Sequence, residues 1–146
     1  MTKGAIVASF DGSKFSANAI HTAVDLATAY DYDLVILNVQ PNLNTRNVQK
    51  FFSNEEIDQY EQETGLKVLE KTRDYLDSTG VSYRFLVAAG IPQEEICKYA
   101  DEADAKYIVM GSRGMGAVMG SILGSVSSGV IHRTKRPVVI VPALAE

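Results

Sequence analysis

Five short apolar runs, separated by longer and mostly amphipathic segments, constrain the fold of this 146-residue chain most strongly. The runs are rich in β-branched residues and nearly continuous, which is typical of parallel strands that helices cover on both faces. They lie at residues 5–8, 34–39, 83–87, 107–110 and 138–141. This alternation predicts a single doubly wound α/β domain over residues 1–146, without a domain boundary, repeat or low-complexity segment.

Four of the intervening segments have the pattern of helices. The first is expected to begin at a cap on Ser13 or Ser16 and to end near Tyr30, and the second covers residues 55–77. Gly80 stops the second helix, because glycine suits the left-handed conformation that ends helices. The remaining two are expected at residues 92–103, opened by a proline, and at residues 125–133.

One irregular stretch, residues 40–54, is longer than a usual connection between a strand and a helix. It is polar and rich in asparagine, except for Phe51 and Phe52. We interpret it as a surface loop. The alternative is a flap over a ligand, because the stretch leaves the carboxyl end of a strand, where folds of this class bind their ligands.

Charge and composition exclude several classes of function. The net charge of −4 gives no general attraction to nucleic acid or to an acidic membrane surface, so a bound phosphate would need local donors. Cys97 is the only cysteine, so an internal disulfide and a cysteine-rich metal site are excluded. No apolar run reaches the length of a membrane span, and the composition suits a reducing cytoplasm. We expect a cytoplasmic protein with no nucleic-acid or membrane partner.

A glycine-rich segment between the fourth predicted strand and the fourth predicted helix carries the main functional signal. It reads Gly111-Ser112-Arg113-Gly114, then nine residues, then Gly124-Ser125. The first N–H groups of a helix have no partner inside the helix, and the helix dipole is positive there. Glycines let the main chain approach an anion, because they carry no Cβ. The segment is therefore typical of a phosphate site, and the alternative is an ordinary turn.

Two further segments are expected to meet this one at the carboxyl ends of the strands. In a doubly wound sheet the first and fourth strands lie side by side, and ligands bind in the crevice between them. Asp11 is placed to accept hydrogen bonds from a ribose or a base, although it could also cap the first helix. Val39 can present main-chain groups to a purine edge, while residues 111–114 and 124–127 hold the phosphates. Arg113 adds a charge there, unless it is an exposed loop residue.

These residues resemble the ATP-binding branch of the universal stress protein (UspA-like) family. That branch is marked by G-x-x-G, nine residues, and G followed by Ser or Thr, which Gly111, Gly114, Gly124 and Ser125 match without a gap. The resemblance covers the whole chain and implies a Rossmann-like sheet of five parallel strands in the order 3-2-1-4-5. It also implies a nucleotide site formed by eleven residues. These are Ser9, Asp11, Val39, Met110, Gly111, Arg113, Gly114, Gly124, Ser125, Val126 and Ser127.

The resemblance implies a regulatory protein of the stress response that binds ATP, with AMP or ADP as alternatives. A Mg²⁺ ion would accompany the phosphates and would not need a protein site, because no carboxylate cluster lies near the glycine segment. The sequence shows no catalytic triad spacing, no metal-ligand cluster and no P-loop lysine. Ser9 departs from the family, where proline is common, so this position would act through its backbone.

Two other functions compete with this interpretation. The first is a slow ATP-hydrolysing or adenylating enzyme on the same fold. Adenylating relatives carry S-G-G-x-D-S after the first strand, and residues 9–13, Ser-Phe-Asp-Gly-Ser, lack the paired glycines. The second is a partner-binding module without a nucleotide, against which the intact glycine pattern argues.

The fifth apolar run predicts how the protein assembles. In the order 3-2-1-4-5, residues 138–141 form an edge strand, whose outer N–H and C=O groups lack a partner strand. Their sequence, Val-Val-Ile-Val between Pro137 and Pro142, would make a bare edge prone to aggregation. An antiparallel pair of identical strands is self-complementary, so we expect a homodimer through this strand. The alternative is a monomer whose edge is shielded by residues 143–146 and the nearby helix.

Overall fold

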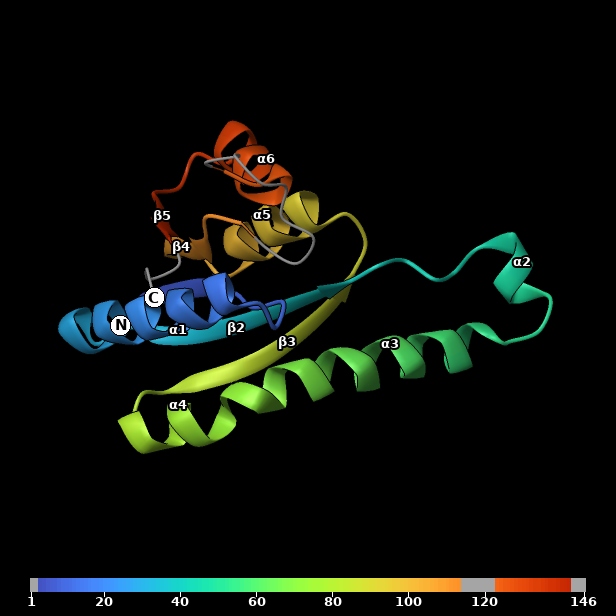
Figure 1. Ribbon diagram of the computed structural model, residues 1–146, viewed down its shortest axis with the longest axis horizontal. Helices are drawn as coiled ribbons and strands as arrows, with labels where there is room; N and C mark the ends of the chain where they lie inside the picture. Colours follow the sequence, from blue (N-terminus) through green and yellow to red (C-terminus); the bar gives the residue numbers. More distant parts are fainter. Residues whose placement is uncertain (1–2, 114–122, 143–146) are drawn as a thin grey trace.

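Five parallel strands form one sheet in the order β3-β2-β1-β4-β5 in the computed structural model, which describes residues 3–113 and 123–142 (Figure 1). The strands are β1 (Ala5–Ser9), β2 (Asp33–Gln40), β3 (Tyr83–Ala89), β4 (Ala105–Gly111) and β5 (Val138–Val141). Neighbouring strands are parallel throughout. The predicted fold class and strand order are confirmed, and each strand begins and ends within two residues of its predicted apolar run.

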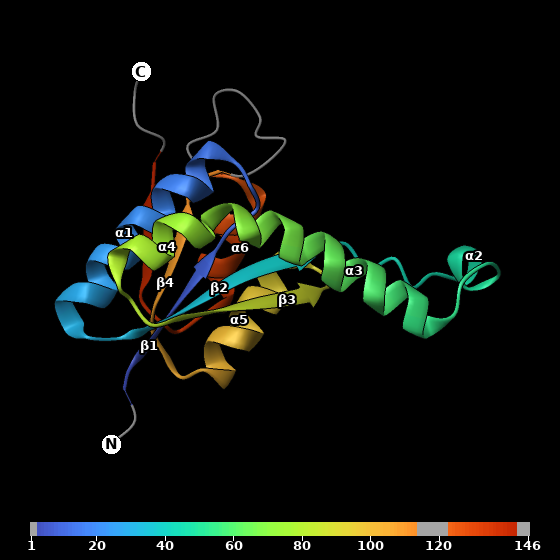
Figure 2. The ribbon, with the colours of Figure 1, turned by 90° about the horizontal axis from the view of Figure 1, so that it is seen from below.

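Helices cover both faces of this sheet, as predicted (Figures 1 and 2). They are α1 (Lys14–Tyr30), α2 (Arg46–Gln49), α3 (Asn54–Leu69), α4 (Arg73–Thr79), α5 (Pro92–Glu102) and α6 (Ser125–Arg133), with a 3-10 turn at Glu70–Thr72. One face packs against α1, α3 and α4, and the other packs against α5 and α6. No helix in the described ranges is long and apolar enough to cross a membrane.

Alternate residues of each strand supply two separate cores, because successive side chains of a strand point to opposite faces. Ile6 and Ile36 are fully buried in the core under α1, whereas Val7 and Leu37 are fully buried in the core under α5. Full burial of an aliphatic side chain stabilises the fold by about 1.5–3 kcal/mol relative to its exposure. The two buried faces explain why the strands appear in the sequence as unbroken apolar runs.

The start of α1 follows the prediction, with Ser13 as its N-cap. The hydroxyl of Ser13 accepts a hydrogen bond of 3.2 Å from the N–H of Ser16. At the other end Asp31 adopts the left-handed conformation, with φ of 55°. These caps satisfy main-chain groups at the two ends of α1. The cap at Ser13 fixes where α1 begins after β1.

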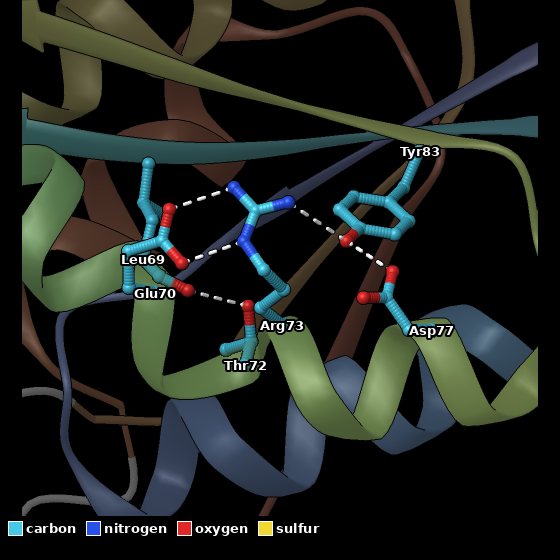
Figure 3. A network of polar contacts seen from close by, with 6 residues as sticks. All are labelled: Leu69, Glu70, Thr72, Arg73, Asp77 and Tyr83. Carbon is cyan, nitrogen blue, oxygen red and sulfur yellow. Dashed lines mark hydrogen bonds and ion pairs between the residues drawn. The ribbon is translucent and has the colours of Figure 1, made fainter.

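The predicted helix over residues 55–77 is divided into α3 and α4 by the 3-10 turn. In this turn the hydroxyl of Thr72 donates a hydrogen bond of 2.7 Å to the main-chain oxygen of Leu69 (Figure 3). The prediction of one uninterrupted helix is therefore wrong. The buried face continues across the turn, from Leu69 to Leu76, so both helices cover the same side of the sheet.

Polar contacts tie α4 and the 3-10 turn to the edge strand β3 (Figure 3). Two guanidinium nitrogens of Arg73 lie 2.6 and 2.7 Å from the carboxylate oxygens of Glu70, and a third donates to the hydroxyl of Tyr83 at 3.2 Å. Tyr83 in turn donates to Asp77 at 2.5 Å. The hydrogen bond from Arg73 lowers the pKa of Glu70, and the Asp77 carboxylate raises the pKa of Tyr83.

Residues 40–54 form a surface segment that includes α2. Its first part is held by Glu61 of α3, whose carboxylate accepts a hydrogen bond of 3.0 Å from the N–H of Leu43. Figures 1 and 2 place α2 at the far end of α3, away from β4 and α6. This agrees with the interpretation as a surface segment, and it does not support a flap over the crevice beside β4.

Candidate functional site

The carboxyl ends of β1 and its two neighbours form the predicted point of convergence. β1 pairs with β2 on one side and with β4 on the other, so the strand order reverses beside it. The register joins Ser9 to Leu37 and Ala8 to Val109, so β2 continues three residues beyond the partner of Ser9 and β4 continues two residues beyond the partner of Ala8. The loops that follow β1 and β4 therefore begin side by side, which is the position at which doubly wound sheets bind ligands.

The turn between β1 and α1 is organised around Asp11. One carboxylate oxygen of Asp11 accepts hydrogen bonds from the N–H of Ser13 at 2.9 Å and from the hydroxyl of Ser16 at 2.8 Å. Gly12 has φ of +90°, a conformation that favours glycine. Because Ser13 is the N-cap of α1, Asp11 supports the cap and is not itself the capping residue. Its side chain stands at the surface, beside the end of β1.

Gly111 ends β4 where α1 comes closest to it. A Cβ atom on Gly111 would lie 2.7–2.9 Å from the Cβ, carbonyl carbon and carbonyl oxygen of Phe15. Atoms of a main chain cannot move aside as a flexible side chain can, so this position requires glycine for packing. Part of the glycine pattern thus serves the contact between β4 and α1, a role that the phosphate interpretation does not include.

The first turn of α6 is hydrogen-bonded to the end of β4. The N–H of Gly124, the N-cap residue, donates to the main-chain oxygen of Ser112 at 2.7 Å. The hydroxyl of Ser127 donates to the same oxygen at 2.8 Å and to that of Gly111 at 3.1 Å. Ser127 is only 2% exposed, whereas Ser125 is exposed. These hydrogen bonds hold the start of α6 against the end of β4.

Arg113 lies between these parts. Its guanidinium carbon is 4.8 Å from the centre of the Phe15 ring, an arrangement in which the cation faces the aromatic π-system. The residue is half-buried. Arg113 is thus placed against the first turn of α1 and next to the residues that precede α6, which leaves a positive charge close to the helix start.

Three apolar residues of the predicted site share one side of the sheet. Met110 is 4% exposed and belongs to the core under α5 and α6, and the half-buried residues Val39 and Val126 pack against that core. Ser9 is half-buried at the end of β1. Of the eleven predicted residues, Gly114 lies outside the described residues. The other ten lie at the ends of β1, β2 and β4 or in the first turn of α6 with its N-cap.

Sequence reasoning missed two residues of this arrangement, Phe15 and Ser16. Both lie in the first turn of α1, where the sequence signalled only a cap and an apolar helix face. The partners of Phe15, namely Gly111 and Arg113, are almost a hundred residues further along the chain, whereas Ser16 bonds to Asp11, five positions before it. Among residues 3–113 and 123–142, no group of three or more His, Cys, Asp or Glu side chains could hold a metal ion.

Comparisons with known proteins agree with the fold and identify a family. A sequence model described as the universal stress protein family matches residues 4–142. The chain is 34% identical over 144 residues to the universal stress protein YxiE of Bacillus subtilis. The alignment covers 93% of this chain and 97% of that protein. The solved structure of MJ0577 matches with a TM-score of 0.82 and 25% identity over the full length of both chains. A universal stress protein solved in complex with cAMP has the same fold, with a TM-score of 0.70, 24% identity, and coverage of 99% of this chain and 100% of that chain.

Proposed function

Since this chain belongs to the universal stress protein family, we propose that it is a regulatory protein of the stress response that binds ATP, with AMP or ADP as alternative ligands. One observation carries the proposal. The first turn of α6 is held against the end of β4 by the bonds of Gly124 and Ser127, directly beside the end of β1. That combination offers helix N–H groups to an anion at the ligand-binding edge of the sheet.

The phosphates would be bound mainly by main-chain groups. N–H groups of Ser125, Val126 and Ser127 stand in the first turn of α6, where the helix dipole is positive. Because the Ser127 hydroxyl already donates to two carbonyl oxygens, its contribution to a phosphate would come from its N–H. The exposed hydroxyl of Ser125 and the charge of Arg113 would add donors, and Gly111, Gly114 and Gly124 would let the main chain come close to a phosphate.

The nucleoside would lie across the ends of β1 and β2. Asp11 would accept hydrogen bonds from the ribose or the base, with Ser9 contributing through its backbone. Val39 and Met110 would present an apolar edge, since both adjoin the core under α5. The universal stress protein solved with cAMP supports an adenine nucleotide as the class of ligand. Mg²⁺ would be bound by the nucleotide phosphates, because the described residues offer no carboxylate cluster.

We further propose that the protein acts in the cytoplasm as a homodimer joined through β5. This strand lies at the edge of the sheet, and all four of its residues are half-buried in the single chain. Two copies of an apolar edge strand complete each other's hydrogen bonding about a two-fold axis.

Calorimetric titration with ATP tests the binding proposal, and Gly114→Val tests the assignment of the loop. A branched side chain at residue 114 should block the approach of the main chain to a phosphate. We expect wild-type protein to bind ATP and the folded variant to lose most of that affinity. Unchanged ATP affinity in a variant with the wild-type circular dichroism spectrum would contradict the assignment of this loop to the phosphates.

A further inference from the structure

We propose that Phe15 is a positioning residue, whose ring holds the guanidinium of Arg113 in place for the phosphates of a bound nucleotide. This inference rests on the proposed function, since it concerns the same site. It assigns a role to a residue of α1 that is neither part of the glycine pattern nor among the predicted binding residues.

Phe15 is held in place by its own main chain. It is the second residue of α1, and its side chain is 9% exposed. Its backbone and Cβ pack so closely on Gly111 that a Cβ there would come within 2.7 Å. The ring is therefore attached to a helix turn that cannot shift away from the end of β4 without losing that contact. Such rigidity is what a support for a flexible side chain requires.

The ring of Phe15 faces Arg113. The distance of 4.8 Å from the guanidinium carbon to the ring centre lies within the range of a favourable cation–π contact. An arginine side chain loses much rotamer freedom when it is fixed on a ligand. If the ring already restricts Arg113 before the ligand arrives, less of that entropy is lost on binding. The aromatic contact leaves the charge of the guanidinium intact, so it can still attract a phosphate.

Phe15 also links the two halves of the proposed site. The next residue in the chain, Ser16, donates to the carboxylate of Asp11 at 2.8 Å. The same helix turn thus contacts the residue assigned to the nucleoside and the residue assigned to the phosphates. We infer that this turn sets the spacing between the two, and that Phe15 governs the phosphate side.

The chain contains a matched control. Arg73 lies over the ring of Phe85 at 4.7 Å, nearly the same separation as in the first pair. That pair joins the start of α4 to the edge strand β3, on the side of β2 away from β1. Phe85→Leu therefore removes an arginine–phenylalanine contact of the same kind without altering the crevice beside β1.

The test compares the binding of ATP and of adenosine by calorimetry. Phe15→Leu should weaken ATP binding by about two- to five-fold, the loss expected for one cation–π contact, and should leave adenosine binding unchanged. Phe15→Tyr keeps an aromatic face and should restore ATP binding. Phe85→Leu should leave both ligands unaffected. In an Arg113→Met background, Phe15→Leu should cause no further loss.

Three results would overturn the proposal. They are unchanged ATP affinity in Phe15→Leu, an equal loss for ATP and adenosine, or the same loss in the Arg113→Met background.

Should Phe15→Leu not fold, Arg113→Lys decides, because it keeps the charge without touching the core. A lysine that binds ATP as well as arginine would show that the contact of the guanidinium with the Phe15 ring is not needed. Absence of ATP binding by the wild type would overturn the proposed function together with this inference, whereas ATP binding indifferent to Phe15 overturns this inference alone.

Discussion

The hydroxyl of Ser127 donates a hydrogen bond of 2.8 Å to the main-chain oxygen of Ser112, and it joins the first turn of α6 to the end of β4. The two residues are 15 positions apart in the chain. Ser127 is buried, and its hydroxyl also lies 3.1 Å from the main-chain oxygen of Gly111. The N–H of Gly124 donates to the same oxygen of Ser112, so the two groups together hold the start of the helix against the end of the strand. A hydrogen bond of this kind stabilises a fold by about 0.5–1.5 kcal/mol.

Ser127→Ala should lower the free energy of unfolding by about 0.5–1.5 kcal/mol, because the hydrogen bonds of a buried hydroxyl are lost while the N–H of Gly124 still donates to the oxygen of Ser112. It should also weaken ATP binding, since the start of α6 would be held less firmly. Ser125→Ala is the matched control in the same turn. Its hydroxyl is exposed, so its free energy of unfolding should change by no more than about 0.5 kcal/mol. Urea denaturation measures both. Equal stability of the two variants would contradict the structural role of Ser127.

Asp11→Ala should weaken AMP and ATP to a similar extent, because the contact assigned to Asp11 involves the ribose or base. The loss of a hydrogen bond to a charged group, about 1.5–3 kcal/mol, corresponds to roughly 10- to 100-fold in affinity. Ser16→Ala serves as the control, since it removes a hydrogen bond to Asp11 and keeps the carboxylate. Calorimetry with both nucleotides gives the comparison. A variant that loses ATP but keeps AMP would place Asp11 near the phosphate tail.

The sheet could be predicted from the sequence because its strands are buried on both faces. β5 was located to the residue, and Ser13 was identified as a possible cap. The prediction rested on local patterns, namely unbroken apolar runs and turn residues. The order of the strands came from the resemblance to a family, and the structure confirms it.

Contacts between distant segments could not be predicted. The buried face of α3 includes Glu61 and Gly65, which no apolar pattern would identify. A Cβ on Gly65 would lie 2.4 Å from a methyl group of Val87. The absence of a side chain at this position therefore lets α3 approach β3 very closely. Tyr60, an aromatic residue of the same helix, is 59% exposed. The pairing of Arg113 with Phe15 is of the same kind, since only the folded chain brings the two together.

The hydrogen bonding of β5 indicates which of its residues would pair in the predicted dimer. The carbonyl oxygen of Pro137 accepts a hydrogen bond of 2.9 Å from Ile108 of β4, and that of Val141 accepts one of 2.9 Å from Ser112, just after β4. The main-chain groups of Val138 and Ile140 therefore point to the outer edge. We expect light scattering to give the mass of a dimer at micromolar concentration. Ile140→Pro, which removes one outward donor, should give a folded monomer. A monomeric wild type would contradict the dimer, and a folded variant that stays dimeric would move the interface elsewhere.

Stability should depend on pH through Glu70. Because its pKa in the folded protein is lowered by Arg73 from the ordinary value of 4.5, the pair stabilises the fold above pH 4.5. That contribution is lost as the pH falls through the lowered pKa, when Glu70 becomes protonated. Glu70→Gln should therefore lower the melting temperature at pH 7 and have little effect at pH 2.5. The effect is small, because both side chains are exposed to solvent. An equal effect at both pH values would contradict this assignment.

Titration of the wild-type protein with ATP in the presence of Mg²⁺ tests whether the chain binds this nucleotide at the proposed site. We expect saturable binding with one ATP for each chain, since each chain carries its own Asp11 and its own first turn of α6. Weaker binding of adenosine should accompany it, because adenosine lacks the groups assigned to Arg113 and Ser125. The absence of saturable ATP binding up to millimolar concentration, in protein whose fold is intact, would contradict the account.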